Sequence, residues 1–182
     1  MFEGVRPAPP DNRANRGMDF EGRLEGVHAR YAAAGAARVD KQYVKALPVK
    51  NGQWAKVIGR CTVDYTGVMR GGRMVAFDAK DCRGARLALD RLQPHQRDYL
   101  QQVARMGGCA FVLARFEDKR GEKQVYAIPI AAWCLAEEAR RTGERRAAEG
   151  FEAAGRASIA LEALPEKWRV KDYDWLSAID GH

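Results

Sequence analysis

The chain has 182 residues, of which 46% are hydrophobic and 30% are charged, a balance typical of a globular protein with a proper core. No apolar run approaches the ~20 residues that span a bilayer, which excludes a membrane-spanning protein. The first residues lack the basic and apolar regions of a secretory signal. These features together predict a cytoplasmic protein.

The net charge of +7 is placed unevenly along the chain. Residues 1–60 carry 11 basic and 6 acidic side chains, residues 61–120 carry 11 and 7, and residues 121–182 carry 9 and 11. A basic excess in the first two thirds fits a polyanionic partner such as nucleic acid. The alternative is a basic protein without any specific polyanionic partner.

The N-terminal part predicts an arm followed by a helix. Residues 1–14 contain three prolines among polar residues, which predicts a flexible N-terminal arm. Residues 17–34 then show helical spacing, and Gly35 is suited to end the helix. The apolar face of this helix consists of Phe20, Leu24, Val27 and Tyr31.

A strand is predicted from Arg38 to Ala46, followed by a hairpin over about residues 45–60. Asn51-Gly52 is a strong two-residue hairpin turn, because both positions favour positive φ. Basic side chains and one tryptophan flank this turn, and they form a candidate DNA-binding surface: Lys45, Lys50, Trp54, Lys56 and Arg60. Trp54 is suited to stack on an exposed base. Cross-strand packing of Trp54 and protection of a strand edge by lysines are the structural alternatives.

The stretch from Cys61 to Lys80 carries the chemistry. Strand side chains alternate between faces, so Asp78 and Lys80 point the same way at the end of the apolar strand Met74–Phe77. Asp64 lies upstream, on a strand that returns through a glycine-rich turn. Two carboxylates bind a hard cation such as Mg²⁺, and the lysine orients water. The combination predicts a magnesium-dependent phosphodiesterase.

The rest of the chain predicts further elements of an α/β fold. A helix begins near Leu92 or Pro94, with Gln96 on its apolar face; the strands are Cys109–Phe116 and Gln124–Ile128, and a helix runs from Pro129 to about residue 141. Residues 142–182 predict a helical tail that packs on the body or on a partner chain. The order of elements favours an α/β domain over residues 15–141, with a mixed central sheet flanked by helices.

At these residues the chain resembles the PD-(D/E)xK nuclease superfamily, and within it the RecU family of Holliday-junction resolvases. The resemblance covers about residues 13–135. The motifs that carry it occur in this order: Asn15-Arg16-Gly17-Met18 followed by Phe20-Glu21, Thr62–Gly67 (TVDYTG), Phe77–Lys80 (FDAK), Leu92–Leu100 with His95-Gln96, and Gly107–Leu113 (GGCAFVL). The chain departs from the family at Asp78, where the family usually carries glutamate.

The resemblance implies a restriction-endonuclease-like fold with a projecting hairpin stalk, and a homodimer that cuts four-way DNA junctions in recombination and repair. It implies Mg²⁺, with Mn²⁺ as a substitute, bound by Asp64, Asp78 and the Ala79 carbonyl. Lys80 would orient the water, and Glu21 and Gln96 would support the site. Arg16 is a candidate phosphate contact.

Two other functions stay open from the sequence. One is a phage-type nuclease of the same superfamily that cuts other DNA. The other is a DNA-binding recombination accessory protein that does not cleave, although the intact Asp64, Asp78 and Lys80 set argues against it. The structural alternatives for the supporting residues are a solvated Glu21 and a Gln96 bonded to backbone.

Overall fold

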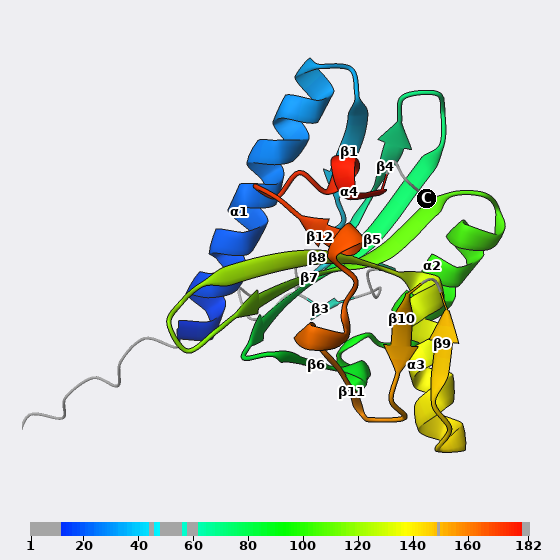
Figure 1. The fold of residues 1–182 in the computed structure, drawn as a ribbon. Helices are drawn as coiled ribbons and strands as arrows, with labels where there is room; N and C mark the ends of the chain where they lie inside the picture. The colour runs from blue at the N-terminus through cyan, green and yellow to red at the C-terminus, as the bar shows by residue number, and fades with distance from the viewer. Residues whose placement is uncertain (1–11, 44–45, 48–55, 58–61, 149, 180–182) are drawn as a thin grey trace, which may run out of the picture.

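A central sheet with helices on both faces forms the body of the protein (Figure 1). The structure is a computed structural model that describes residues 12–43, 46–47, 56–57, 62–148 and 150–179, and of residues 12–17, 46–47 and 56–57 it describes the backbone alone. Within these ranges, no helix is both long enough and apolar enough to cross a bilayer.

The main sheet has six strands in the order β1-β4-β5-β7-β8-β12. Its strands are β1 (Ala37–Lys41), β4 (Tyr65–Met69), β5 (Met74–Arg83), β7 (Cys109–Glu117), β8 (Lys123–Pro129) and β12 (Arg169–Val170). β5 and β7 run parallel because helix α2 (Pro94–Arg105) connects them, whereas every other pair in this sheet is antiparallel. The predicted α/β class with a mixed central sheet is confirmed.

Two hydrophobic cores lie on opposite faces of this sheet. One core joins the sheet to α1 (Asn12–Ala33) and α4 (Trp175–Ile179), and the other joins it to α2 and α3 (Ile130–Thr142). Strand β5 contributes to both, because Val75 and Phe77 face α1 while Ala76 faces α2. The same alternation decides where each polar residue of β5 points.

Helix α1 follows the predicted pattern over most of its length. Its apolar stripe of Phe20, Leu24, Val27 and Tyr31 is buried, and Gly35 follows with a φ of 59°. The helix begins at Asn12, within the range 1–14 for which the sequence predicts an arm. Met106 follows the last helical residue of α2 and is 79% exposed.

The glycines between β4 and β5 serve two purposes. Gly71 and Gly72 form the turn, with φ values of 90° and 88° that favour glycine. Gly67 lies inside β4. There it allows β1 to approach closely, since a Cβ atom at Gly67 would clash with the Arg38 carbonyl oxygen.

Short elements complete the structure. Within the described residues these are β2 (Ala46–Leu47), β3 (Lys56–Val57), β6 (Arg86–Ala88), η1 (Leu89–Arg91), β9 (Arg146–Ala148), β10 (Phe151–Ala153), β11 (Ser158–Ala160), η2 (Leu161–Ala163) and η3 (Glu166–Trp168). β2 and β3 pair antiparallel, as expected for the two arms of the predicted hairpin. The turn at Asn51-Gly52 lies outside the described residues, so the projecting stalk stays a prediction.

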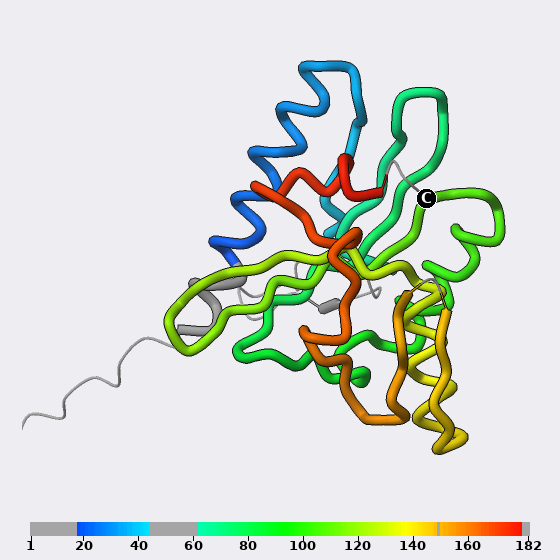
Figure 2. Tube along the Cα trace, viewed as in Figure 1, coloured from blue at the N-terminus to red at the C-terminus, as the bar shows by residue number. Residues whose placement is uncertain are grey.

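The C-terminal segment differs from the helical tail that the sequence predicts. The described residues 143–148 and 150–179 contain short strands and 3-10 turns, with one helix, α4, of five residues. Gly143, Gly150 and Gly155 have positive φ, so the alanine- and glutamate-rich stretch cannot continue as one helix. β11 pairs with β6, and β12 forms the edge of the main sheet (Figure 2).

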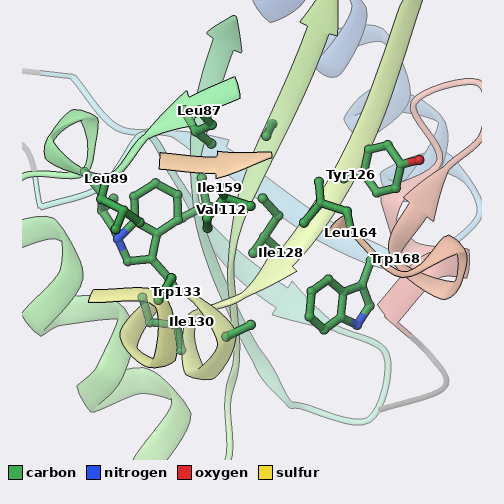
Figure 3. Close-up of a cluster of buried hydrophobic side chains, with 14 of the residues drawn as sticks. Leu87, Leu89, Val112, Tyr126, Ile128, Ile130, Trp133, Ile159, Leu164 and Trp168 are labelled. Atoms are coloured by element: carbon green, nitrogen blue, oxygen red, sulfur yellow. The ribbon is translucent and has the colours of Figure 1, made fainter. Parts of the chain in front are cut away.

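This segment is part of the hydrophobic body. Figure 3 shows Ile159, Leu164 and Trp168 packing around Val112 and Ile128 of the sheet. The segment therefore contributes to the same folded unit as the residues before 142.

A network of rings and hydrogen bonds docks α4 on α1. The Trp175 indole nitrogen donates a hydrogen bond to His28 Nε2 at 3.1 Å, and the Tyr31 hydroxyl donates one to Asp174 at 2.5 Å. The Leu176 amide donates to the same Tyr31 hydroxyl at 3.1 Å. Burial lowers the pKa of His28 from 6.5 to about 4, while Asp40 partly opposes this shift. His28 is therefore a neutral acceptor at pH 7.

We expect this histidine to make the fold sensitive to mild acid. The unfolded chain binds a proton at His28 below pH 6.5, but the folded chain does so only near pH 4. Stability from this group is therefore complete above pH 6.5 and is lost as the pH falls towards 4, by at most about 3 kcal/mol. Urea unfolding of wild type and His28→Phe across this range checks it. Parallel stability profiles for the two proteins would contradict it.

Candidate active site

The candidate site is built on the second half of β5. Asp78 and Lys80 face α2, because Phe77 and Ala79 on the same strand face the α1 core. The Asp78 side chain is fully buried, and its Oδ2 atom lies 2.5 Å from Lys80 Nζ. Gln96, from the first turns of α2, donates a hydrogen bond from Nε2 to Asp78 Oδ1 at 2.5 Å. The predicted residues Lys80 and Gln96 therefore both contact Asp78.

Asp64 joins the site from the position immediately before β4. Tyr65 pairs with Phe77 in the β4–β5 ladder, so Asp64 lies beside Asp78. Asp64 Oδ2 accepts a hydrogen bond from the Ala79 amide at 2.9 Å. The backbone pairing of β4 with β5 ends at Tyr65 and Phe77, and this side-chain bond follows it. It fixes the Asp64 carboxylate against the backbone of β5.

The electrostatics of the site centre on Asp78. Burial, followed by the neighbouring Asp64 carboxylate, raises the pKa of Asp78 to about 6, while Lys80 acts in the opposite direction. Two adjacent carboxylates beside a single ammonium repel each other, and a further positive charge would stabilise their ionised forms. A divalent cation supplies such a charge.

The residues present fit a hard divalent cation. Asp78 Oδ2 is buried and accepts no hydrogen bond of good geometry in the described structure, although Lys80 Nζ is close. The described residues contain no cluster of three or more His, Cys, Asp or Glu side chains, so two carboxylates would need further oxygen ligands. Mg²⁺ commonly binds through one or two carboxylates with water and substrate phosphate, and the Ala79 carbonyl is adjacent.

Glu21 does not contact these carboxylates. Its Oε2 atom lies 2.7 Å from Lys41 Nζ, and Glu25 lies 4.0 Å from the same ammonium. Lys41 lies opposite Tyr65 in the β1–β4 ladder, so the two side chains share one face of the sheet. Tyr65 belongs to the core under α1, so this is the face that α1 covers. Glu21 therefore lies on the opposite face of the sheet from Asp78, and a supporting role for it stays a prediction.

The predicted DNA-binding residues are not tested by the structure. Lys45, Lys50, Trp54 and Arg60 lie outside the described residues, and for Arg16 and Lys56 the structure describes only the backbone, in α1 and β3. Their proposed contacts to DNA stay predictions from the sequence.

A buried arginine next to the site was not among the residues predicted from the sequence. Arg115 lies in β7, among mostly apolar residues, and its side chain is completely buried. It binds Asp81 on β5 and Asp19 on α1. Such a residue is detectable in a sequence, because a charge inside an apolar run requires a buried partner.

Replacing Gln96 with methionine is expected to lower the catalytic rate by about 10–100-fold, the usual cost of removing a group that orients a ligand side chain. Gln96 also caps α2, because its Oε1 accepts a hydrogen bond from the Gln93 amide at 3.0 Å. Gln93→Ala is the matched control, since it removes the other half of this capping box and leaves Asp78 untouched. Equal rates for the two variants would show that Gln96 acts only as a cap.

Comparison with known proteins identifies the family. The RecU family, described as "Recombination protein U", matches residues 15–165. This chain belongs to the RecU family. The match extends beyond the residues that carried the resemblance and includes most of the short elements after α3.

Named RecU relatives align with much of the chain. The Holliday junction resolvase RecU of Geobacillus sp. (strain WCH70) is 30% identical over 159 residues, 80% of this chain and 75% of that protein. The one of Shouchella clausii is 32% identical over 124 residues, 63% of this chain and 59% of that protein. A solved structure, Archaeoglobus fulgidus Hjc, a Holliday junction resolvase, matches with a TM-score of 0.34 and 15% identity over 61% of this chain and 78% of that chain.

Proposed function

We propose that this RecU-family chain is a structure-specific endonuclease that resolves four-way (Holliday) DNA junctions. The observation that carries the proposal is the contact set of Asp64, Asp78, Ala79, Lys80 and Gln96. It occurs in a family whose named members are Holliday junction resolvases. The reaction is hydrolysis of a phosphodiester bond, and it depends on Mg²⁺, with Mn²⁺ as a substitute.

Asp64, Asp78 and the Ala79 carbonyl are the proposed ligands of the metal. When bound, a divalent cation supplies Lewis-acid stabilisation of the charge that develops on the scissile phosphate. Asp64 is held ready by the Ala79 amide, and Asp78 is held by Gln96. Both carboxylates are therefore oriented before any DNA arrives, and no reorganisation is required of them during the reaction.

Lys80 is the proposed water-orienting residue. Its ammonium lies against Asp78 Oδ2, and an ammonium has three donors with which it can bind the attacking water or a phosphate oxygen. Asp78 holds the ammonium in place, because the flexible lysine side chain alone defines no single position. The lysine side chain is 14% exposed, so it is largely enclosed by protein and keeps a small surface that solvent and substrate can reach.

A resolvase that leaves symmetric nicks must cut two strands related by two-fold symmetry. A homodimer with one site in each subunit satisfies this requirement. The basic hairpin over about residues 45–60 is the proposed contact to the junction centre, through Lys45, Lys50, Trp54, Lys56 and Arg60. Arg16 is a proposed phosphate contact, and Glu21 is kept as a proposed supporting group.

The test is cleavage of a labelled synthetic four-way junction beside a linear duplex of the same sequence, with Mg²⁺ and with chelator. The proposal expects paired nicks in the junction, little cutting of the duplex, and no product in chelator. Equal cutting of both substrates would favour a nuclease of the same superfamily with another DNA substrate. Binding without cutting under every metal condition would favour a non-cleaving accessory protein.

A further inference from the structure

Asp81, the residue after Lys80, is held from both faces of the sheet. Its two carboxylate oxygens accept hydrogen bonds from Arg115 Nε and Nη2, each at 2.9 Å. Its backbone carbonyl accepts a hydrogen bond from Arg91 Nη1 at 2.8 Å. Arg115 lies opposite Asp81 on the neighbouring strand β7, and Arg91 reaches it from η1 on the other face. We call these three residues the Asp81 clamp.

The part of β5 that carries the site needs such support. Pairing with β4 ends at Tyr65 and Phe77, so in the described main sheet residues 78–83 of β5 pair with β7 alone. On the open edge, the Ala79 amide bonds to the Asp64 side chain. A strand that is paired on one side frays more easily than one paired on both. Asp78 and Lys80 both lie in this one-sided stretch.

The arginine of the clamp is itself fixed. Arg115 is completely buried, its Cζ atom lies 4.7 Å from the Phe20 ring centroid, and its Nη1 donates a third hydrogen bond, to Asp19 of α1, at 2.7 Å. Lys123, which begins β8, also binds Asp19 at 3.1 Å, where the β7–β8 hairpin reaches α1 (Figure 1). A planar guanidinium matches a carboxylate with two parallel bonds. The two hydrogen bonds from Arg115 therefore fix the orientation of the Asp81 carboxylate as well as its distance from the guanidinium.

We propose that Asp81 is a positioning residue, and that the Asp81 clamp fixes the end of β5 so that Lys80 stays against Asp78. The inference rests on the proposed function, because Lys80 is the group it positions. Side chains that alternate on one strand share its backbone, so rotation or fraying at Asp81 moves the Lys80 Cα atom directly. A misplacement of about 1 Å costs on the order of 10²-fold in rate.

Two matched variants separate positioning from stability. Asp81→Ala and Asp19→Ala each remove one carboxylate from the same buried guanidinium, but only Asp81 adjoins Lys80. With saturating junction and Mg²⁺, Asp81→Ala is expected to lower the single-turnover cleavage rate by about 10–100-fold, and Asp19→Ala by less than about threefold. The dissociation constant for the junction, measured in chelator, should change little in either variant.

Amide hydrogen exchange gives a readout that does not depend on cleavage. Asp81→Ala should raise exchange over residues 78–83 by about tenfold or more, whereas Asp19→Ala should raise it in α1 instead. Three results would each overturn the clamp. The first is an equal cleavage rate for the two variants, and the second is a loss of rate that is fully explained by the lowered melting temperature of each variant. The third is unchanged exchange over residues 78–83. A wild type that cuts no DNA would overturn the proposed function, and hydrogen exchange would still decide whether the clamp exists.

A milder variant covers the case in which Asp81→Ala does not fold. Within the described residues, Arg91→Ala removes the hydrogen bonds to the Asp81 carbonyl and the Cys82 thiol, and it leaves the buried ion pair of Asp81 and Arg115 intact. It is expected to lower the single-turnover rate by about three- to tenfold and to raise exchange over residues 78–83. If a folded Arg91→Ala protein shows neither change, the clamp is wrong.

Discussion

Replacing Lys80 with alanine is expected to lower the rate of junction cleavage by about 10²–10⁴-fold, the range for loss of a group that handles a proton or orients water. Lys80 Nζ lies 2.5 Å from Asp78 Oδ2, and the lysine is largely enclosed. No other lysine of the described residues contacts Asp64 or Asp78. Among the described residues, no nearby ammonium is therefore available to replace it.

Binding should survive this substitution. Affinity for DNA comes mainly from many phosphate contacts along a basic surface, so one lysine of the site contributes little. We expect the junction dissociation constant of Lys80→Ala to change by less than about threefold, and Asp78→Asn to lose cleavage in the same way. Lys171→Ala, which removes one exposed positive charge outside the site, is the control. Cleavage by Lys80→Ala or Asp78→Asn within about tenfold of wild type would contradict the site assignment.

The residues of the candidate site could be predicted because they lie on regular elements. Period-two alternation on one strand places Asp78 and Lys80 together, and helical spacing places Gln96 on the buried face of α2. Asp64 follows from the same hairpin. Each of these inferences needs only the local geometry of one strand, one turn or one helix.

Partners that come from distant parts of the chain could not be predicted in this way. Helical spacing places Glu21 near the apolar stripe of α1, but it does not tell that Lys41 of β1 binds its carboxylate. Arg115 meets Asp19 across 96 positions of sequence, and only the order of strands in the sheet brings them together. Such pairs depend on the complete topology and carry no periodic signal.

The short elements after residue 142 escaped prediction for a related reason. β12 has two residues, and β9, β10 and β11 have three each, too few to show an alternating pattern. Their hydrogen bonds are supplied by β6, β8 or a neighbouring short strand. The buried tryptophans were the better guide, because a large apolar ring must be covered by some part of the protein.

Trp175→Ala is expected to lower the free energy of unfolding by about 3–5 kcal/mol, the usual cost of removing a buried large aromatic side chain. Trp175 is completely buried, and its ring centroid lies 5.1 Å from that of Tyr31 and 5.3 Å from that of Phe77. The indole also supplies the hydrogen bond that His28 accepts. Truncation therefore leaves both a cavity and a buried imidazole without its donor.

Urea unfolding at pH 7 measures this loss, and Met106→Ala is the control, because Met106 is 79% exposed and its truncation should cost less than about 0.5 kcal/mol. Phe77 directly precedes Asp78, so the cavity opens behind the strand that carries the site. A loss below about 1 kcal/mol for Trp175→Ala would mean that α4 does not dock on α1 in solution. A loss in the expected range makes the C-terminal segment part of the core on which β5 is held.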